Sequence, residues 1–169
     1  MTIRPLNACD VETYRALMLE AYEVYPQAFT SSVAERAAMP LSWWQKRLDG
    51  ALDRLLGAYA GDALVGIVGL AFEPREKARH KVTLFGMYVT PAHQRNGLGR
   101  RLVQAALDQA REHPHLKVVQ LTVTAGNDAA FALYRRCGFI QYGLEPLAVR
   151  VGLDYFDKIH MWRELRGEG

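Results

Sequence analysis

Hydrophobic residues recur along the chain in two spacings, and each spacing predicts a kind of element. Runs rich in Val, Leu and Ile predict strands, whereas apolar residues three and four positions apart predict helices. We expect strands at residues 3–6, 54–59, 63–72, 81–90, 118–124, 139–142 and 155–162, and helices at residues 11–25, 33–48, 97–112 and 128–137. The order β-α-α-β-β-β-α-β-α-β-β is typical of an α/β (α+β) fold in which helices cover both faces of a mixed sheet.

Polar residues, glycines and prolines mark the ends of these elements. Asp10 is expected to cap the first helix, and Pro40 makes the second helical stretch irregular. Asn127 or Asp128 is expected to cap the last helix, and Gly138 to end it in the left-handed conformation.

Composition favours one domain that spans residues 1–169. The apolar run 63–72 is about half as long as a membrane-spanning helix, and the N-terminus lacks the layout of a signal peptide. We therefore expect a cytoplasmic protein with no membrane partner. The formal net charge of +3 is too small to indicate a nucleic-acid partner. Cys9 and Cys137 have no paired spacing, so neither a disulfide framework nor a metal site is expected.

A loop with two glycines, Gly97 and Gly99, leads into the third helix. The N-terminus of a helix carries unpaired N–H groups and a partial positive charge. Arg100 and Arg101 in the first turn are therefore unfavourable unless an anion binds in front of them. The glycines would let such a ligand contact the amides of residues 95–99. We expect a phosphate or pyrophosphate site; the alternative is a glycine-rich turn whose arginines are only solvated.

Two common nucleotide-binding motifs do not fit this loop. The dinucleotide fingerprint needs a third glycine and an acid about twenty residues further on, but Arg100 and Arg101 follow Gly99 and no acid ends a second strand. The P-loop needs a Gly-Lys-Ser/Thr triplet, which the sequence does not contain.

Residues 94–99, QRNGLG, resemble the Q/R-x-x-G-x-G/A signature of the GCN5-related N-acetyltransferase (GNAT) superfamily. Residues 124–139, TAGNDAAFALYRRCGF, resemble its second hallmark, an Asn near a strand end followed by a helix with the pattern A-x-x-x-Y-x-x-x-G-F. The resemblance covers nearly the whole chain. It implies a mixed, mostly antiparallel central sheet of about seven strands, with about four helices on both faces, splayed between the fourth and fifth strands.

The resemblance also implies an activity. The protein would transfer an acetyl group from acetyl-CoA to a primary amine of a small molecule or peptide, by direct attack in a ternary complex and without a metal. The pyrophosphate would lie on the loop amides, and the pantetheine arm would run beside the strand before the loop. Gly86 would form a bulge that opens the gap, or it is only a packing glycine. The expected cofactor contacts are Met87, Tyr88, Val89, Gln94, Arg95, Asn96, Gly97, Leu98, Gly99, Arg100, Asn127, Ala130 and Tyr134.

Three of these residues have catalytic roles by the same resemblance. The N–H of Val89 would stabilise the tetrahedral oxyanion, and Tyr134 would protonate the departing thiolate. Asn127 would contact the pantetheine or position a water molecule. Alternatively, Tyr134 is a core aromatic residue paired with Phe131, and Asn127 is only a helix cap.

The general base and the acceptor are less defined by sequence. Many relatives carry a Glu on the strand before the loop, but residues 81–90 contain no acid, so a base would act through water from Glu23, Asp157 or His160. The expected acceptor contacts are Tyr22, Glu23, Phe29, Tyr155 and Asp157, unless the aromatic residues are ordinary core.

Two other functions compete with acetyl transfer. A catalytically idle acyl-CoA-binding or regulatory module on the same fold would also explain the motifs, and the missing acid favours it. RNA binding through the basic loop lacks the aromatic residues that usually accompany it. The sequence leaves the oligomeric state open, with a homodimer as the candidate assembly.

Overall fold

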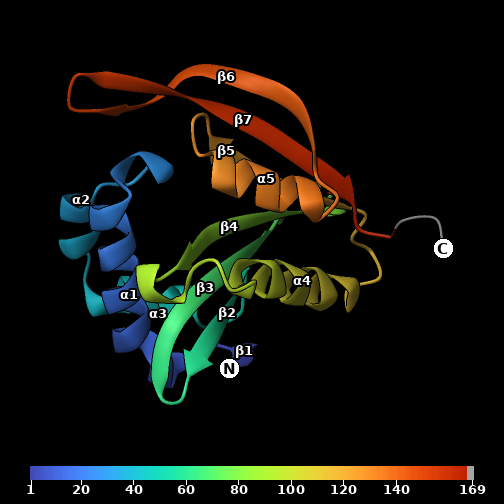
Figure 1. Cartoon of the computed structure of the whole chain (residues 1–169). Helices are drawn as coiled ribbons and strands as arrows, with labels where there is room; N and C mark the ends of the chain where they lie inside the picture. The colour runs from blue at the N-terminus through green and yellow to red at the C-terminus, as the bar shows by residue number, and fades with distance from the viewer. Residues whose placement is uncertain (167–169) are drawn as a thin grey trace.

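The computed structural model describes residues 1–166 and has a seven-stranded sheet at its centre (Figure 1). Within these residues, no helix is long and apolar enough to cross a membrane. The strands are β1 (Thr2–Pro5), β2 (Asp53–Ala60), β3 (Ala63–Phe72), β4 (Lys81–Val89), β5 (Val118–Thr124), β6 (Ile140–Val151) and β7 (Asp154–Glu164). The α-helices are α1 (Val11–Val24), α2 (Val33–Ala37), α3 (Leu41–Arg47), α4 (Leu98–Arg111) and α5 (Asp128–Arg136).

The strands lie in the order β1-β2-β3-β4-β5-β7-β6. Only β4 and β5 are parallel neighbours; the other adjacent pairs in the described sheet are antiparallel. Helix α4 connects these two parallel strands, as a parallel pair requires. The prediction of a mixed, mostly antiparallel sheet of about seven strands is confirmed.

Helices cover both faces of the sheet, and each face has its own apolar core. On one face α4 and α5 pack over the sheet, with Leu102, Val103 and Leu107 of α4 fully buried. On the other face α1 and α3 contribute Tyr14 and Trp44, whose rings meet edge to face at 5.4 Å. The site described below lies where the sheet opens between these two cores.

The stretch 33–48 forms two short helices rather than the single irregular helix that the sequence predicts. Ser32 begins α2 with a capping box, in which its hydroxyl accepts a hydrogen bond from the amide of Glu35 at 3.1 Å. Pro40 has extended backbone, with φ −67° and ψ 158°, and starts the separate helix α3. A proline has no N–H to continue the helical hydrogen-bond ladder, so the chain changes direction there.

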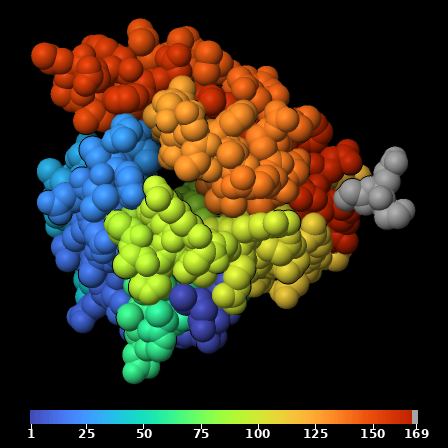
Figure 2. Space-filling view, in the orientation of Figure 1, coloured from blue at the N-terminus to red at the C-terminus, as the bar shows by residue number. Residues whose placement is uncertain are grey.

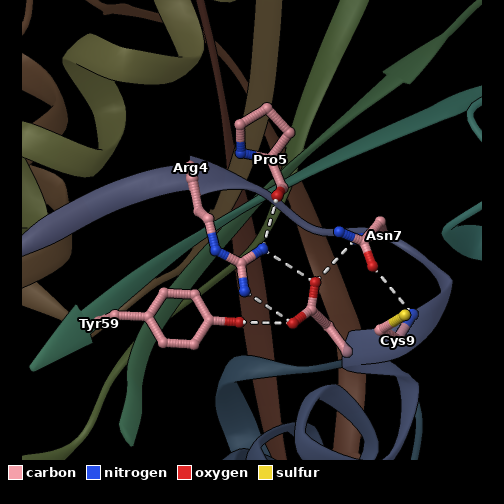
Figure 3. Close-up of polar contacts among 6 residues, drawn as sticks. Arg4, Pro5, Asn7, Cys9 and Tyr59 are labelled. Atoms are coloured by element: carbon pink, nitrogen blue, oxygen red, sulfur yellow. Dashed lines mark hydrogen bonds and ion pairs between the residues drawn. The ribbon is translucent and has the colours of Figure 1, made fainter. Parts of the chain in front are cut away.

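Asp10 stands directly before α1, but the expected cap hydrogen bond from its side chain is absent from the described structure. The carboxylate instead accepts two hydrogen bonds from the guanidinium of Arg4, at 2.8 and 2.9 Å (Figure 3). It also accepts from the hydroxyl of Tyr59 at 3.0 Å and from the amide of Asn7 at 2.8 Å. The pairing with Arg4 holds the pKa of Asp10 well below its usual range.

The last two strands are longer than the sequence predicts. Strand β6 continues through Gly143 and Pro146, which read as turn residues in the sequence. It is the edge strand of the sheet, where a proline is tolerated, and the register with β7 shifts around Pro146. The amide of Leu147 donates to Oδ1 of Asp157 at 2.8 Å, which fixes this irregular part of the hairpin.

Candidate functional site

Strands β4 and β5 pair at one end only. Lys81–Thr83 are in register with Val118–Gln120, but β4 continues to Val89 and β5 to Thr124 without further pairing. The opening begins next to Gly86, which has a φ of +64° and lies at a register shift between β3 and β4. A bulge at this position bends β4 away from β5. The predicted splay between the fourth and fifth strands is confirmed.

A cavity of about 310 Å³ fills the opening and passes from one face of the sheet to the other. Its lining on the face of α4 and α5 includes Leu84, Met87, Asn127, Ala130, Leu133 and Tyr134. Its lining on the face of α1 and α3 includes Tyr14, Met18, Tyr22, Phe29, Arg36 and Arg47. The space-filling view shows a hollow bounded by the N-terminal helices in blue, the segment before α4 in yellow-green and α5 in orange (Figure 2). Two reactants can therefore approach this cavity from opposite faces.

The glycine loop before α4 presents several unpaired donors. Within residues 1–166, no acceptor is within hydrogen-bonding distance of the amides of Asn96, Gly97 and Arg100. Gly97 has a φ of +84°, and a Cβ there would meet no atom within 4 Å, so its surface is open to a ligand. Together with the dipole of α4, these donors form a concave site that favours an anion.

Two neighbouring residues hold this loop in place. A Cβ on Gly99 would lie 3.2 Å from Leu133, so glycine here allows α4 to approach α5 rather than to expose backbone to a ligand. The side-chain amide of Gln94 donates to the carbonyl oxygen of Val89 at 2.8 Å and to the hydroxyl of Tyr25 at 3.1 Å. The loop is thereby tied to the end of β4.

The N–H of Val89 points into the opening between β4 and β5. The amide of Thr90 donates to the carbonyl oxygen of Val65 on β3 at 2.9 Å. Backbone groups of successive residues in a strand point to opposite edges, so those of Val89 are directed away from β3. Val89 accordingly offers a backbone donor at the splay.

Tyr134 is buried and lines the cavity from α5. Its ring meets Phe139 edge to face at 5.9 Å, rather than the expected partner Phe131. Its hydroxyl makes no hydrogen bond within residues 1–166 and is not among the fully buried unpaired atoms, which agrees with its place in the cavity lining. Burial raises the pKa of Tyr134 far above its usual value, so the phenol is protonated at neutral pH and is a weaker acid than an exposed tyrosine.

Asn127 caps a helix and also lies in the lining of the cavity. Its side-chain oxygen accepts a hydrogen bond from the amide of Ala130 at 3.3 Å, so it is the N-cap of α5. It also lines the cavity. At the other end of α5, Gly138 has a φ of +88° and ends the helix as predicted.

The expected acceptor contacts divide into two groups. Tyr22 and Phe29 line the cavity, and their rings meet edge to face at 5.1 Å. Glu23, Tyr155 and Asp157 are not part of the lining: Glu23 is exposed on α1, Tyr155 is exposed on β7, and Asp157 binds the amide of Leu147. Of the five expected contacts, only Tyr22 and Phe29 therefore line the cavity, and from the last hairpin the lining includes Lys158 instead of Tyr155 or Asp157.

The sequence analysis misses the cationic residues of the lining, Arg36, Arg47 and Lys158. Two of them belong to the stretch that Pro40 divides, Arg36 to α2 and Arg47 to α3. The described lining contains no Asp or Glu, and the candidate bases Glu23, Asp157 and His160 all lie outside it. In residues 1–166, no group of three or more His, Cys, Asp or Glu is placed to hold a metal ion.

Comparisons with known proteins agree with this geometry. A model of the acetyltransferase (GNAT) family matches residues 14–139. The chain is 38% identical over 113 residues to the N-alpha-acetyltransferase RimI of Mycobacterium tuberculosis, covering 66% of this chain and 68% of that protein. It is 32% identical over 82 residues to a spermidine N(1)-acetyltransferase of Vibrio cholerae, covering 48% and 47% of the two chains. The crystal structure of a ribosomal-protein-alanine N-acetyltransferase from Brucella melitensis superposes with a TM-score of 0.80 at 25% identity, covering 97% of this chain and 99% of that one.

Proposed function

Because the chain belongs to the acetyltransferase (GNAT) family, we propose that it transfers an acetyl group from acetyl-CoA to a primary amine of a small molecule or peptide, by direct attack in a ternary complex. The observation that carries the proposal is the cavity through the splayed sheet. It joins a face that carries the family's Asn and Tyr, Asn127 and Tyr134, to a second face with room for another molecule. Both reactants would meet in one cavity, so that the acetyl group passes directly from one to the other.

Acetyl-CoA would bind from the face of α4 and α5. Its pyrophosphate would accept hydrogen bonds from the loop amides between Gln94 and Arg100, helped by the dipole of α4. Arg95 and Arg100 are exposed residues of the same loop and first helical turn, so their guanidinium groups would add to the attraction for a phosphate. The pantetheine arm would extend along Met87, Tyr88 and Val89 in the place where β5 no longer pairs with β4.

The chemistry then needs few side chains. The nitrogen lone pair of the amine attacks the thioester carbonyl, and the N–H of Val89 donates a hydrogen bond to the oxyanion that forms. The carbon–sulfur bond breaks as the carbonyl is restored, and the thiolate takes the hydroxyl proton of Tyr134. The proton lost by the amine nitrogen leaves to solvent, from which Tyr134 is reprotonated. A thiolate is already a fair leaving group, so Tyr134 contributes to the rate without being indispensable.

Removal of the amine proton is assigned to a water relay. Each of the three candidate bases lies next to a lining residue: His160 pairs across the sheet with Thr122, and Glu23 and Asp157 adjoin Tyr22 and Lys158 in the chain. The base is the part of the mechanism that the family motifs do not define.

The competing function is an idle module that binds acyl-CoA without turning it over. Both functions predict that acetyl-CoA binds, so binding does not separate them. The test is release of the CoA thiol from acetyl-CoA across a panel of amines, with the mass of the acetylated product as confirmation. Thiol release that depends on an amine supports the enzyme, and binding without release by any amine supports the idle module.

A homodimer, a cytoplasmic location and the absence of a nucleic-acid partner also stay predictions. Light scattering of the purified protein tests the dimer. Large apolar side chains that are exposed in the described chain concentrate on the β6–β7 hairpin: Ile140, Tyr142, Leu144, Leu147, Leu153 and Tyr155. An interface through this hairpin would bury them.

A further inference from the structure

We infer that the acceptor carries a negatively charged group in addition to its amine, as a free amino acid does, and that Arg36, Arg47 and Lys158 bind this group. The inference rests on the proposed function and names the class of acceptor. It comes from the charges that line one half of the cavity. This half contains three cationic side chains and, within the described residues, no carboxylate.

All three cations belong to the half of the cavity that faces away from α4 and α5. Arg36 comes from α2 and Arg47 from α3. On β7, Ile159 and Met161 pack in the core beneath α4 and α5, so Lys158, one residue before Ile159, faces the opposite side of the sheet. The acetyl-CoA half has no cation in its lining, which places the charge with the acceptor.

These cations are not neutralised by acids of the described chain. None of them forms an ion pair within 4.0 Å with a carboxylate in residues 1–166. Asp53 interacts with Arg47 only through space, and Glu145, opposite Lys158 on β6, lies 3.9 Å from His160. Half-buried cations with no carboxylate in contact are unfavourable, and an anionic ligand would supply that contact.

The two arginines are held in fixed positions that suit a planar anion. The guanidinium carbons of Arg36 and Arg47 lie 4.3 and 4.6 Å from the ring centre of Trp43. Stacking of this kind orients a guanidinium and leaves its in-plane N–H groups available as donors, although Arg47 also interacts with the hydroxyl of Tyr14. The Nε of Arg36 is buried and has no hydrogen-bond acceptor in the described structure. A carboxylate, which accepts two parallel hydrogen bonds from arginine, matches these donors.

The same charges help the reaction itself. A positive environment disfavours the ammonium form of the acceptor and so lowers the pKa of its amine. A larger share of the bound amine is then unprotonated and able to attack. This effect reduces the demand on a general base, which the cavity lining does not supply. A polyamine, in contrast, would place further positive charge beside Arg36 and Arg47.

The other residues of the lining indicate what kind of side chain the acceptor carries. Tyr22, Phe29 and Phe85 offer aromatic surface next to the cations. An amino acid with an apolar or aromatic side chain satisfies both features, since its carboxylate meets the arginines while its side chain packs on the rings. Binding by this chemistry selects against spermidine and against peptides whose first carboxylate is remote from the amine.

The experiment compares acceptors that differ in one charge. Initial rates of CoA thiol release are measured with phenylalanine, leucine and methionine, with the corresponding amino acid amides, with the phosphonate analogue of leucine and with spermidine. We expect kcat/KM to fall about tenfold to a hundredfold from each amino acid to its amide, although the less basic amine of the amide is unprotonated to a larger extent at neutral pH. Retained activity with the phosphonate would show that any anion suffices, and its loss would restrict the site to carboxylates.

Two variants connect this preference to the named residues. Arg47→Gln should reduce the ratio of kcat/KM between acid and amide toward one, whereas Lys46→Gln, which removes an exposed charge from the same helix outside the cavity, should leave it unchanged. Acetyl-CoA affinity, measured calorimetrically, should be the same in both variants and shows that they are folded. If amides or spermidine are turned over at least as fast as amino acids, this inference is wrong, but the proposed acetyltransferase activity still stands. Binding of acetyl-CoA with no turnover of any amine overturns the proposed function as well.

Discussion

The side-chain amide of Gln94 donates a hydrogen bond to the carbonyl oxygen of Val89, with 2.8 Å between the two atoms. The bond ties the glycine loop to the end of β4 and points the loop amides in one direction. We predict that Gln94→Ala weakens acetyl-CoA binding about fivefold, the effect of losing one hydrogen bond. Calorimetric titration measures it. Tyr25→Phe, which removes only the acceptor of the second Gln94 bond, should change the affinity less.

Gly97 gives a sharper test of the phosphate site. Gly97→Asp should weaken acetyl-CoA binding about a hundredfold or more, because it puts a carboxylate into the space proposed for the pyrophosphate. Gly97→Asn is the matched control: it has nearly the same shape and also tolerates the φ of +84°, but it is neutral. Equal affinities of the two variants would mean that no phosphate binds at this loop.

Tyr134→Phe separates a proton donor from a core aromatic residue. The variant keeps the ring that packs on Phe139 and loses only the hydroxyl that has no partner in residues 1–166. We predict nearly unchanged acetyl-CoA affinity and melting temperature, with kcat lower by about tenfold to a thousandfold. The rates should be compared with an acceptor for which chemistry is slow. A kcat equal to that of the wild type would remove Tyr134 from the mechanism.

The carboxylate of Asp10 should make stability depend on acid pH. Its pKa is lowered in the folded protein by Arg4, so the stabilisation is present above the unfolded value of about 3.9 and is lost as the pH falls through the folded value. We predict that Asp10→Asn lowers the free energy of unfolding by about 1–3 kcal/mol at pH 7 and by less at pH 3. Urea unfolding at the two pH values measures the difference. Asp62→Asn, in the exposed turn between β2 and β3, should have little effect at either pH.

The sequence predicts those strands and helices whose bounds are set by residues close to them in the chain. The bounds of β3 and β5 agree with the hydrophobic pattern, because these strands are buried and end at glycine or polar residues. Helix α4 follows from its apolar spacing and from Gly97 before it. The proposed acetyl-CoA side of the site is predictable for the same reason. Its glycine loop and the N-terminus of α5 are each formed by one short, continuous motif.

The acceptor side is not predictable in this way, because it depends on contacts between distant segments. Arg36 and Arg47 line the cavity from two helices that Pro40 divides, and both guanidinium groups stack on Trp43. Asp157, which the sequence suggests as an acceptor contact, is instead used to hold Leu147 in the irregular part of β6. Neither relationship leaves a periodic signal in the sequence.

The most direct test of the account is the initial rate of CoA thiol release by the wild-type protein, measured while acetyl-CoA and an amino acid acceptor are both varied. Direct attack in one cavity predicts no release without the amine and double-reciprocal lines that intersect. It also predicts that the protein incubated with acetyl-CoA alone gains no acetyl group, as intact mass spectrometry would show. Parallel lines with an acetylated protein, or no amine-dependent release from a bound acetyl-CoA, would contradict the account.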